Sequence, residues 1–267
     1  MSLDQSVMQD QETTVAGLSL RYRRSGSGVP LLFLHSESGI QFSEPLLAEL
    51  AKHFDVIAPH HPGWGYTDDV PSIRSVDDIS YVYLALLEDL DLRGVVVVGA
   101  SLGGWLAAEL IAKRSDRISR AVLISPLGIR ASTEPTVVDI RNHFALAPAA
   151  VDQALYGSKG PAIDLSVLSD EKLEELAVAR EITTRLAWDP YMHDPSLRWR
   201  LAFVNVPVLT VWGDDNQYVS EAYIDAFDAA LPMVSRSELV GAGHRIDEQL
   251  PAEVAHNIVD FVREGNG

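Results

Sequence analysis

A serine flanked by glycines stands between a run of valines and an apolar helical segment. Residues 95–112 read VVVVGASLGGWLAAELIA, with Ser101 at the junction. The four valines predict a strand covered on both faces, because β-branched side chains suit a buried, pleated surface. Gly99 and Gly103 permit a sharp turn that leaves the Ser101 hydroxyl projecting at the carboxyl end of the strand. Unpaired N–H groups of the first helical turn favour a developing negative charge there, so the pattern predicts a nucleophile.

Other side chains with catalytic chemistry follow the predicted strands at their carboxyl ends, where open α/β sheets bind ligands. These segments are residues 35–39, 60–65, 101–103, 125–128, 213–218 and 243–244. They bring together Ser101, an acidic loop and His244, in the order serine, aspartate, histidine. These are the three residue types of a catalytic triad.

Alternation of strand and helix patterns predicts an α/β fold with a doubly wound, mostly parallel sheet and right-handed crossovers. Residues 12–15 and 18–24 alternate around a tight turn and predict an antiparallel hairpin at the sheet edge. A helix is expected to begin at Ser75, which can cap it together with the acidic Asp78. Further strands are expected at 29–34, 55–59, 118–125, 206–212 and 235–240, and further helices at 45–54, 221–230 and 251–264.

The pattern changes between the strand ending near residue 125 and the strand beginning at 206. Residues 126–205 have few strand candidates, so we expect a helical lid inserted into a core formed by 1–125 and 206–267. The insertion holds several large residues: Trp188, Tyr191, Met192, His193 and Trp199. Trp188 and Met192, together with Trp64 from an earlier loop, are candidates for substrate binding. The alternative is that they pack among themselves.

Composition limits the possible partners. The 267 residues carry a net charge of −17, which disfavours nucleic acid and anionic membranes. The chain has no cysteine, so disulfides and thiolate chemistry are excluded. The polar, acidic N-terminal residues lack the pattern of a signal peptide, and we expect a cytoplasmic protein. A small-molecule substrate is the expected partner, and the sequence leaves a homodimer open.

The chain resembles the α/β-hydrolase superfamily, because it carries several motifs in the order in which that family has them. The nucleophile elbow G-x-S-x-G spans 99–103, and the strand ending in His35 resembles the oxyanion loop. Residues 60–67 (HHPGWGYT) resemble the family's loop D-x-P-G-x-G-x-S. Residues 206–215 (VPVLTVWGDD) resemble the strand that carries the acid, and residues 243–251 resemble the terminal G-H segment. Capped members that cleave small esters or carbon–carbon bonds of diketone-like acids look nearest.

The resemblance implies covalent catalysis without a cofactor. His244 would take the proton of Ser101 during attack on a carbonyl and return it to the leaving group. The oxyanion hole would consist of backbone N–H groups of Leu102 and of the turn at Ser36 and Glu37.

The acid position departs from the family. The slot three residues after the glycine of the acid strand holds Asn216, whereas Asp215 and Asp214 precede it. An asparagine can orient an imidazole but cannot stabilise an imidazolium, and the equivalent change in a serine protease costs about 10⁴ in turnover. We expect the loop to turn Asp215 toward His244. The alternative is an altered, slow or inactive site with Asn216 in the acid slot.

Two loops also depart from the family. Ser36 replaces a glycine, and Glu37 places a carboxylate beside the expected oxyanion. We expect Glu37 to point to solvent; an inward carboxylate would oppose an oxyanion, act as a base or contact substrate. His60 replaces an aspartate, but the spacing of His60, His61 and His35 is not that of a metal site, and structural hydrogen bonding is expected.

Three functions fit these residues. The first is a cofactor-free serine hydrolase acting on a small or medium, largely apolar, ester-like carbonyl compound. The second is a carbon–carbon bond hydrolase or lyase of the same fold, to which the changes at Ser36, Glu37 and Asn216 point. The third is a ligand-binding protein on a catalytically impaired hydrolase scaffold.

Overall fold

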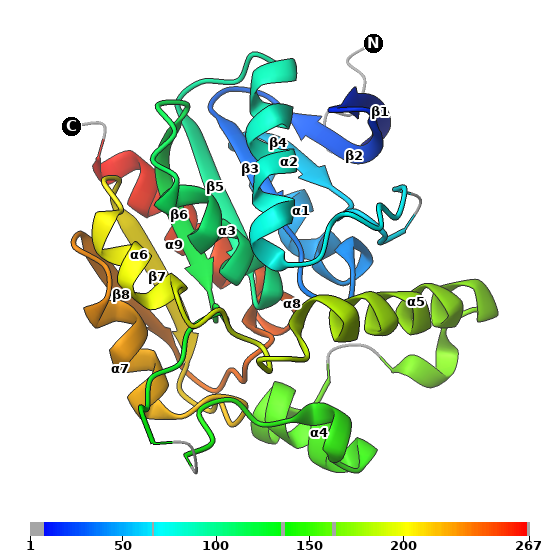
Figure 1. Cartoon of the computed structure of the whole chain (residues 1–267), viewed down its shortest axis with the longest axis vertical. Coiled ribbons are helices and arrows are strands. Elements are labelled where there is room, and N and C mark those ends of the chain that lie inside the picture. The colour runs from blue at the N-terminus through cyan, green and yellow to red at the C-terminus, as the bar shows by residue number, and fades with distance from the viewer. Residues whose placement is uncertain (1–7, 66, 135–136, 162–163, 266–267) are drawn as a thin grey trace.

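A single twisted sheet runs through the centre of the molecule (Figure 1), in a computed structural model that describes residues 8–65, 67–134, 137–161 and 164–265. Its eight strands lie in the order β1-β2-β4-β3-β5-β6-β7-β8. Strands β3 to β8 pair in parallel, whereas β2 pairs antiparallel with β1 and β4. The strands are β1 Gln9–Val15, β2 Leu18–Gly26, β3 Pro30–Leu34, β4 Asp55–Pro59, β5 Val95–Ala100, β6 Ile118–Ile124, β7 Val208–Gly213 and β8 Val234–Leu239. The predicted mostly parallel α/β sheet and its edge hairpin are confirmed.

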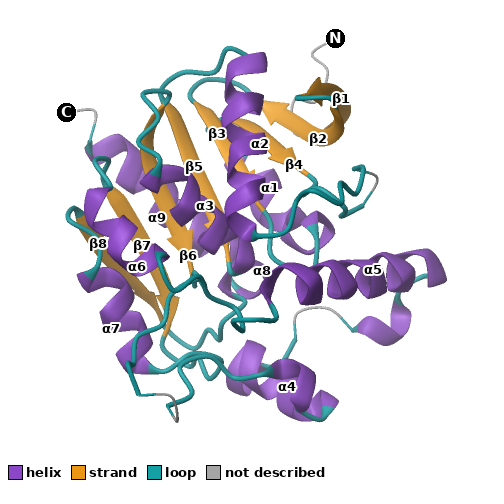
Figure 2. Cartoon of the chain, viewed as in Figure 1, coloured by secondary structure: helices purple, strands orange, loops and turns teal. Residues whose placement is uncertain are grey.

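Helices cover both faces of the sheet (Figure 2). One apolar cluster joins the sheet to α2, α3 and α7, and a second joins its other face to α1 and α9. The helices are α1 Glu44–Leu50, α2 Val76–Asp89, α3 Leu102–Ala112, α4 Pro148–Tyr156, α5 Asp170–Ala187, α6 Leu197–Arg200, α7 Glu221–Ala229, α8 Ile246–Gln249 and α9 Pro251–Glu264. Among the helices of the described ranges, none combines the length and apolar character that crossing a membrane requires.

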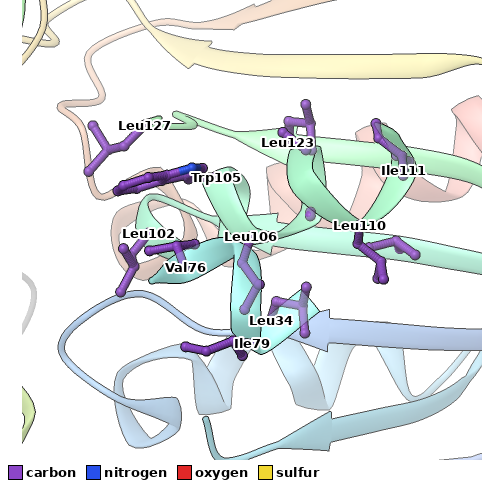
Figure 3. Close-up of a cluster of buried hydrophobic side chains, with 14 of the residues drawn as sticks. Leu34, Val76, Ile79, Leu102, Trp105, Leu106, Leu110, Ile111, Leu123 and Leu127 are labelled. Atoms are coloured by element: carbon purple, nitrogen blue, oxygen red, sulfur yellow. The ribbon is translucent and has the colours of Figure 1, made fainter. Parts of the chain in front are cut away.

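Strand β5 is buried along its whole length. Val95 and Val97 belong to the cluster on one face, and Val96 and Val98 to the cluster on the other, as the two-residue period of a strand requires. Figure 3 shows the adjacent helix α3 packed through Leu106 and other apolar side chains. This double packing fixes the end of β5, from which the nucleophile projects.

Helix α2 begins as the sequence predicts. The Ser75 hydroxyl accepts a hydrogen bond from Asp78 N (3.1 Å), and the Asp78 carboxylate accepts one from Ser75 N (3.0 Å). This reciprocal capping satisfies two N–H groups that the helix itself leaves without partners.

The segment between β6 and β7 contains α4, α5 and α6. In Figure 2 the arrowheads of the central strands point toward the end of the molecule that α4 and α5 occupy. One short bridge, between Gly128 and His193, lies within the segment, and another connects it to the loop after β7, between Ile140 and Val219. The segment is helical as expected, and its action as a lid with boundaries at residues 126 and 205 stays a prediction.

Candidate active site

Ser101 occupies a strained turn between β5 and α3. Its backbone has φ 54° and ψ −112°, a conformation that residues other than glycine rarely adopt. A Cβ on Gly99 would lie 2.1 Å from Gly103 O, and one on Gly103 would lie 2.0 Å from Leu34 O. Glycine is therefore required at both positions, and the turn presents the Ser101 side chain at the end of the sheet.

His244 lies against the Ser101 hydroxyl. Its Nε2 is 2.9 Å from Ser101 Oγ, and both residues are almost wholly buried. The backbone N–H of His244 donates to Leu155 O at 2.7 Å. The Tyr218 ring packs edge-on against the imidazole, with 4.7 Å between the ring centres. Burial, and then the charge of Arg245, lower the pKa of His244 to about 3. The imidazole is therefore neutral at pH 7.

Asn216, rather than an aspartate, faces the other nitrogen of His244. Its Nδ2 lies 3.4 Å from His244 Nδ1. Its Oδ1 accepts hydrogen bonds from Tyr218 N at 3.0 Å and from Val219 N at 3.3 Å. Because the amide oxygen is held by two backbone N–H groups, the amide NH₂ is the group presented to the histidine.

The expectation that Asp215 turns toward His244 is wrong. The Asp215 carboxylate accepts hydrogen bonds from Ser158 N (2.6 Å), from Ser158 Oγ and from Gln217 Nε2 (2.9 Å). These hydrogen bonds, first those of Ser158, lower the pKa of Asp215 to about 2. Donors that follow α4 thus hold the carboxylate away from the histidine.

Glu37 points into the site, so the expectation that it faces solvent is also wrong. Ser101 Oγ donates to Glu37 Oε2 at 3.0 Å, and Arg245 Nη2 donates to Glu37 Oε1 at 2.7 Å. Glu37 is 8% exposed. Burial alone would raise the pKa of Glu37, but nearby positive charge, above all Arg245, outweighs it and the net pKa lies below its usual value. The side chain is therefore a buried carboxylate.

Arg245 is a residue of the site that the sequence reasoning missed. It is 1% exposed, and its Nη2 also donates to Ser38 Oγ at 3.0 Å. Its Nε lies 3.8 Å from Glu248 Oε1. Burial raises the pKa of Glu248 to about 8. Glu37, at 2.7 Å, is the carboxylate that forms the hydrogen-bonded ion pair with Arg245. The sequence signal that could have identified Arg245 is that a basic residue directly follows His244.

The turn expected to hold an oxyanion is formed by Ser36 and Glu37. Gly39 N donates to Ser36 O at 3.1 Å, and Trp64 Nε1 donates to Glu37 O at the same distance. Leu102 is the first residue of α3, where helix geometry leaves the N–H without an intrahelical partner.

The weaker substrate-binding candidates lie in different environments. Trp64 is buried and its Nε1 donates to Glu37 O, and Met192 is wholly buried in the larger apolar cluster. Trp188 is 49% exposed and packs edge-on against Tyr191 and Phe144. Their contact with a substrate stays a prediction.

The histidines after β3 and β4 form hydrogen bonds to the loops around them. His61 Nε2 lies 2.9 Å from His35 O, and His61 N donates to His35 Nε2 at 3.1 Å. Burial lowers the pKa of His61 to about 3 and holds that of His35 well below its usual value. The expected structural role is confirmed for these two residues, while Tyr66 in the same predicted motif lies outside the described residues.

A sequence profile described as "Alpha/beta hydrolase family" matches residues 31–257. The chain belongs to the α/β-hydrolase family. It is 25% identical to a non-heme chloroperoxidase of Streptomyces lividans over 94% of this chain and 98% of that protein. It is 26% identical to a non-heme haloperoxidase of Rhodococcus erythropolis, over 85% and 88% of the two chains.

Solved structures of other hydrolases share this α/β-hydrolase fold. A meta-cleavage product hydrolase superposes with a TM-score of 0.75 at 19% identity, over 95% of this chain and 98% of its own. Naproxen esterase from Bacillus subtilis superposes with a TM-score of 0.74 at 14% identity, over 96% of this chain and 92% of its own. At this level of identity the likeness establishes the fold alone.

The placement of Asp215 generates a prediction for Asp215→Asn. The variant should change the rate at which Ser101 reacts with a fluorophosphonate by less than about threefold, because the carboxylate does not contact His244. It should lower stability at pH 7, since a group whose folded pKa is depressed stabilises the fold above its unfolded pKa. That stability difference should vanish as the pH falls from about 4 toward 2.

Labelling followed by mass spectrometry and thermal unfolding across pH measure the two effects. Asp214→Asn, at the neighbouring exposed carboxylate, is the matched control. A hundredfold loss of labelling in Asp215→Asn alone would contradict this account of the loop.

Proposed function

We propose that the chain is a serine hydrolase that cleaves small or medium, largely apolar carbonyl compounds of ester type through an acyl-enzyme at Ser101. The observation that carries the proposal is the contact of 2.9 Å between Ser101 Oγ and His244 Nε2, at a strained turn at the end of the sheet. Such strain is stored at functional sites, since packing alone would be served equally well by a relaxed turn.

The residues supply each requirement of acyl transfer. Ser101 Oγ attacks the carbonyl carbon, and two side chains able to exchange protons with it, His244 and Glu37, lie within 3.0 Å. In this scheme the N–H of Leu102, at the start of α3, donates to the oxygen that becomes negative. Water then attacks the acyl-enzyme and releases the acid. Asp215, which lies away from His244, takes no part in this scheme.

The surroundings of the site support an uncharged substrate. The charges of Glu37 and Arg245 pair with each other across 2.7 Å. A substrate charge would have to compete with that pair or remain without a partner after burial, which is costly. The Tyr218 ring packs against His244, and Tyr191 in the β6–β7 segment packs against Phe144 and Trp188. These rings favour an apolar acyl or leaving group.

The proposal predicts covalent labelling of Ser101. A fluorophosphonate should modify the native chain at Ser101, and Ser101→Ala should lose both the label and ester turnover. Intact mass and peptide mapping locate the label, and Ser125→Ala, at another buried serine after a strand, is the matched control.

An unlabelled native chain whose thermal unfolding is shifted upward by apolar carbonyl compounds would contradict the proposal. That outcome would indicate a ligand-binding protein instead.

Carbon–carbon bond cleavage is a second candidate, favoured by the Glu37 carboxylate beside Ser101. Cleavage of a diketone-like acid requires a proton to be delivered to carbon, and a second proton carrier at the nucleophile suits that step. The structure of the meta-cleavage product hydrolase establishes only that the shared fold can host such chemistry.

A substrate series separates the two reactions. We expect kcat/KM for nitrophenyl esters of short acyl chains to exceed that for vinylogous diketone acids, with both lost in Ser101→Ala. A series in which the diketone acids dominate would replace the ester assignment by the carbon–carbon one. The control is the same series measured on Asp214→Asn.

A further inference from the structure

The hydrogen bonds around His244 define which of its nitrogens carries the proton. In the described residues the partner of Nδ1 is the Asn216 amide NH₂, at 3.4 Å, and that amide can only donate. Nδ1 must therefore be an acceptor. Because the imidazole is neutral, its single proton lies on Nε2.

An Nε2–H group reverses the direction of the contact with Ser101. The imidazole N–H then donates to Ser101 Oγ across 2.9 Å instead of accepting from it. The hydroxyl proton is left to point at the remaining acceptor, Glu37 Oε2, 3.0 Å away. The chain of donors runs from Asn216 through His244 and Ser101 to Glu37.

We propose that Glu37, rather than His244, is the general base that takes the proton of Ser101. The inference rests on the proposed function in that it takes Ser101 as the nucleophile. Glu37 is then a catalytic residue, because it contacts the reacting oxygen, and His244 is a positioning residue that holds a lone pair of Ser101 toward the carbonyl. Arg245 fixes the carboxylate by its hydrogen bond to the second oxygen, Oε1.

The proton balance closes with water as the only co-reactant. The Ser101 O–H bond breaks and its proton moves to Glu37 while Oγ bonds to the carbonyl carbon, whose π electrons move to oxygen. As the tetrahedral intermediate collapses, the bond to the leaving-group oxygen breaks and that oxygen takes the proton from Glu37. Water attacks the acyl-enzyme while Glu37 takes its proton. The bond between Ser101 Oγ and the acyl carbon then breaks, Glu37 returns that proton to Oγ, and the acid departs.

The charge of Arg245 makes a carboxylate tolerable beside a developing oxyanion. Glu37 and Arg245 form a buried pair that is neutral as a unit. Once Glu37 accepts the proton it becomes uncharged, and the positive Arg245 remains near the new negative oxygen. The pair therefore opposes the oxyanion less than an isolated carboxylate would.

The test measures the second-order rate of Ser101 labelling by a fluorophosphonate in the full chain. Glu37→Gln keeps the shape of the side chain but removes the base, and should slow labelling by at least about 100-fold. His244→Gln keeps an amide N–H donor but offers no base at that nitrogen, and should slow labelling by less than about tenfold. A triad histidine would lose far more, about 10⁴-fold or beyond.

Rescue distinguishes chemistry from altered structure. Asn216→Asp supplies an acceptor to Nδ1, moves the imidazole proton there and frees Nε2 as a base. Adding it to Glu37→Gln should recover at least about tenfold of the lost rate. Glu238→Gln, at an exposed glutamate of β8, is the matched control and should label like the native chain.

The outcomes decide the matter in either direction. A Glu37→Gln rate equal to the native rate shows that the carboxylate is not the base, and a faster rate shows that it obstructs the oxyanion. A loss in His244→Gln larger than that in Glu37→Gln also overturns the inference. Failure of the native chain to label at all would instead overturn the proposed function.

Discussion

The buried ion pair between Glu37 and Arg245 is the constraint on which the site depends. The two side chains are 9% and 2% exposed, and a hydrogen bond of 2.7 Å joins positions separated by 208 residues. Removing one partner of such a pair costs about 3–5 kcal/mol, because an uncompensated charge stays buried. Arg245 directly follows His244, and Glu37 contacts Ser101. The pair therefore fixes the loop after β3 against the histidine loop, with Ser101 between them.

The β6–β7 segment completes the same arrangement. Leu155 O accepts hydrogen bonds from the N–H groups of His244 (2.7 Å) and Arg245 (3.0 Å). Two residues after α4 ends, Ser158 donates to the carboxylate of Asp215. The end of α4 thus holds both the histidine loop and the loop that follows β7. Asp215 connects these loops to the segment instead of orienting the histidine, and among the described residues Asn216 is the partner of His244 Nδ1.

The fold was predictable from the sequence because its signals are local. The valine run and the glycines around Ser101 define β5 and the elbow within a few residues, and Ser75 and Asp78 cap α2 in the same way. The directions of Glu37 and Asp215 were not predictable, because each depends on a partner distant in sequence, Arg245 and Ser158. Backbone spacing places a loop residue at the site, whereas long-range hydrogen bonds decide where its side chain points.

The position of the proton on His244 tests the central claim most directly. Chain labelled with ¹⁵N-histidine, compared with His244→Gln to assign the signals, reports which ring nitrogen carries hydrogen at pH 7. We predict a protonated Nε2 and an unprotonated Nδ1 in the native chain, and the reverse in Asn216→Asp. A native imidazole protonated at Nδ1 would leave Nε2 free to act as the base and would contradict the assignment of Glu37.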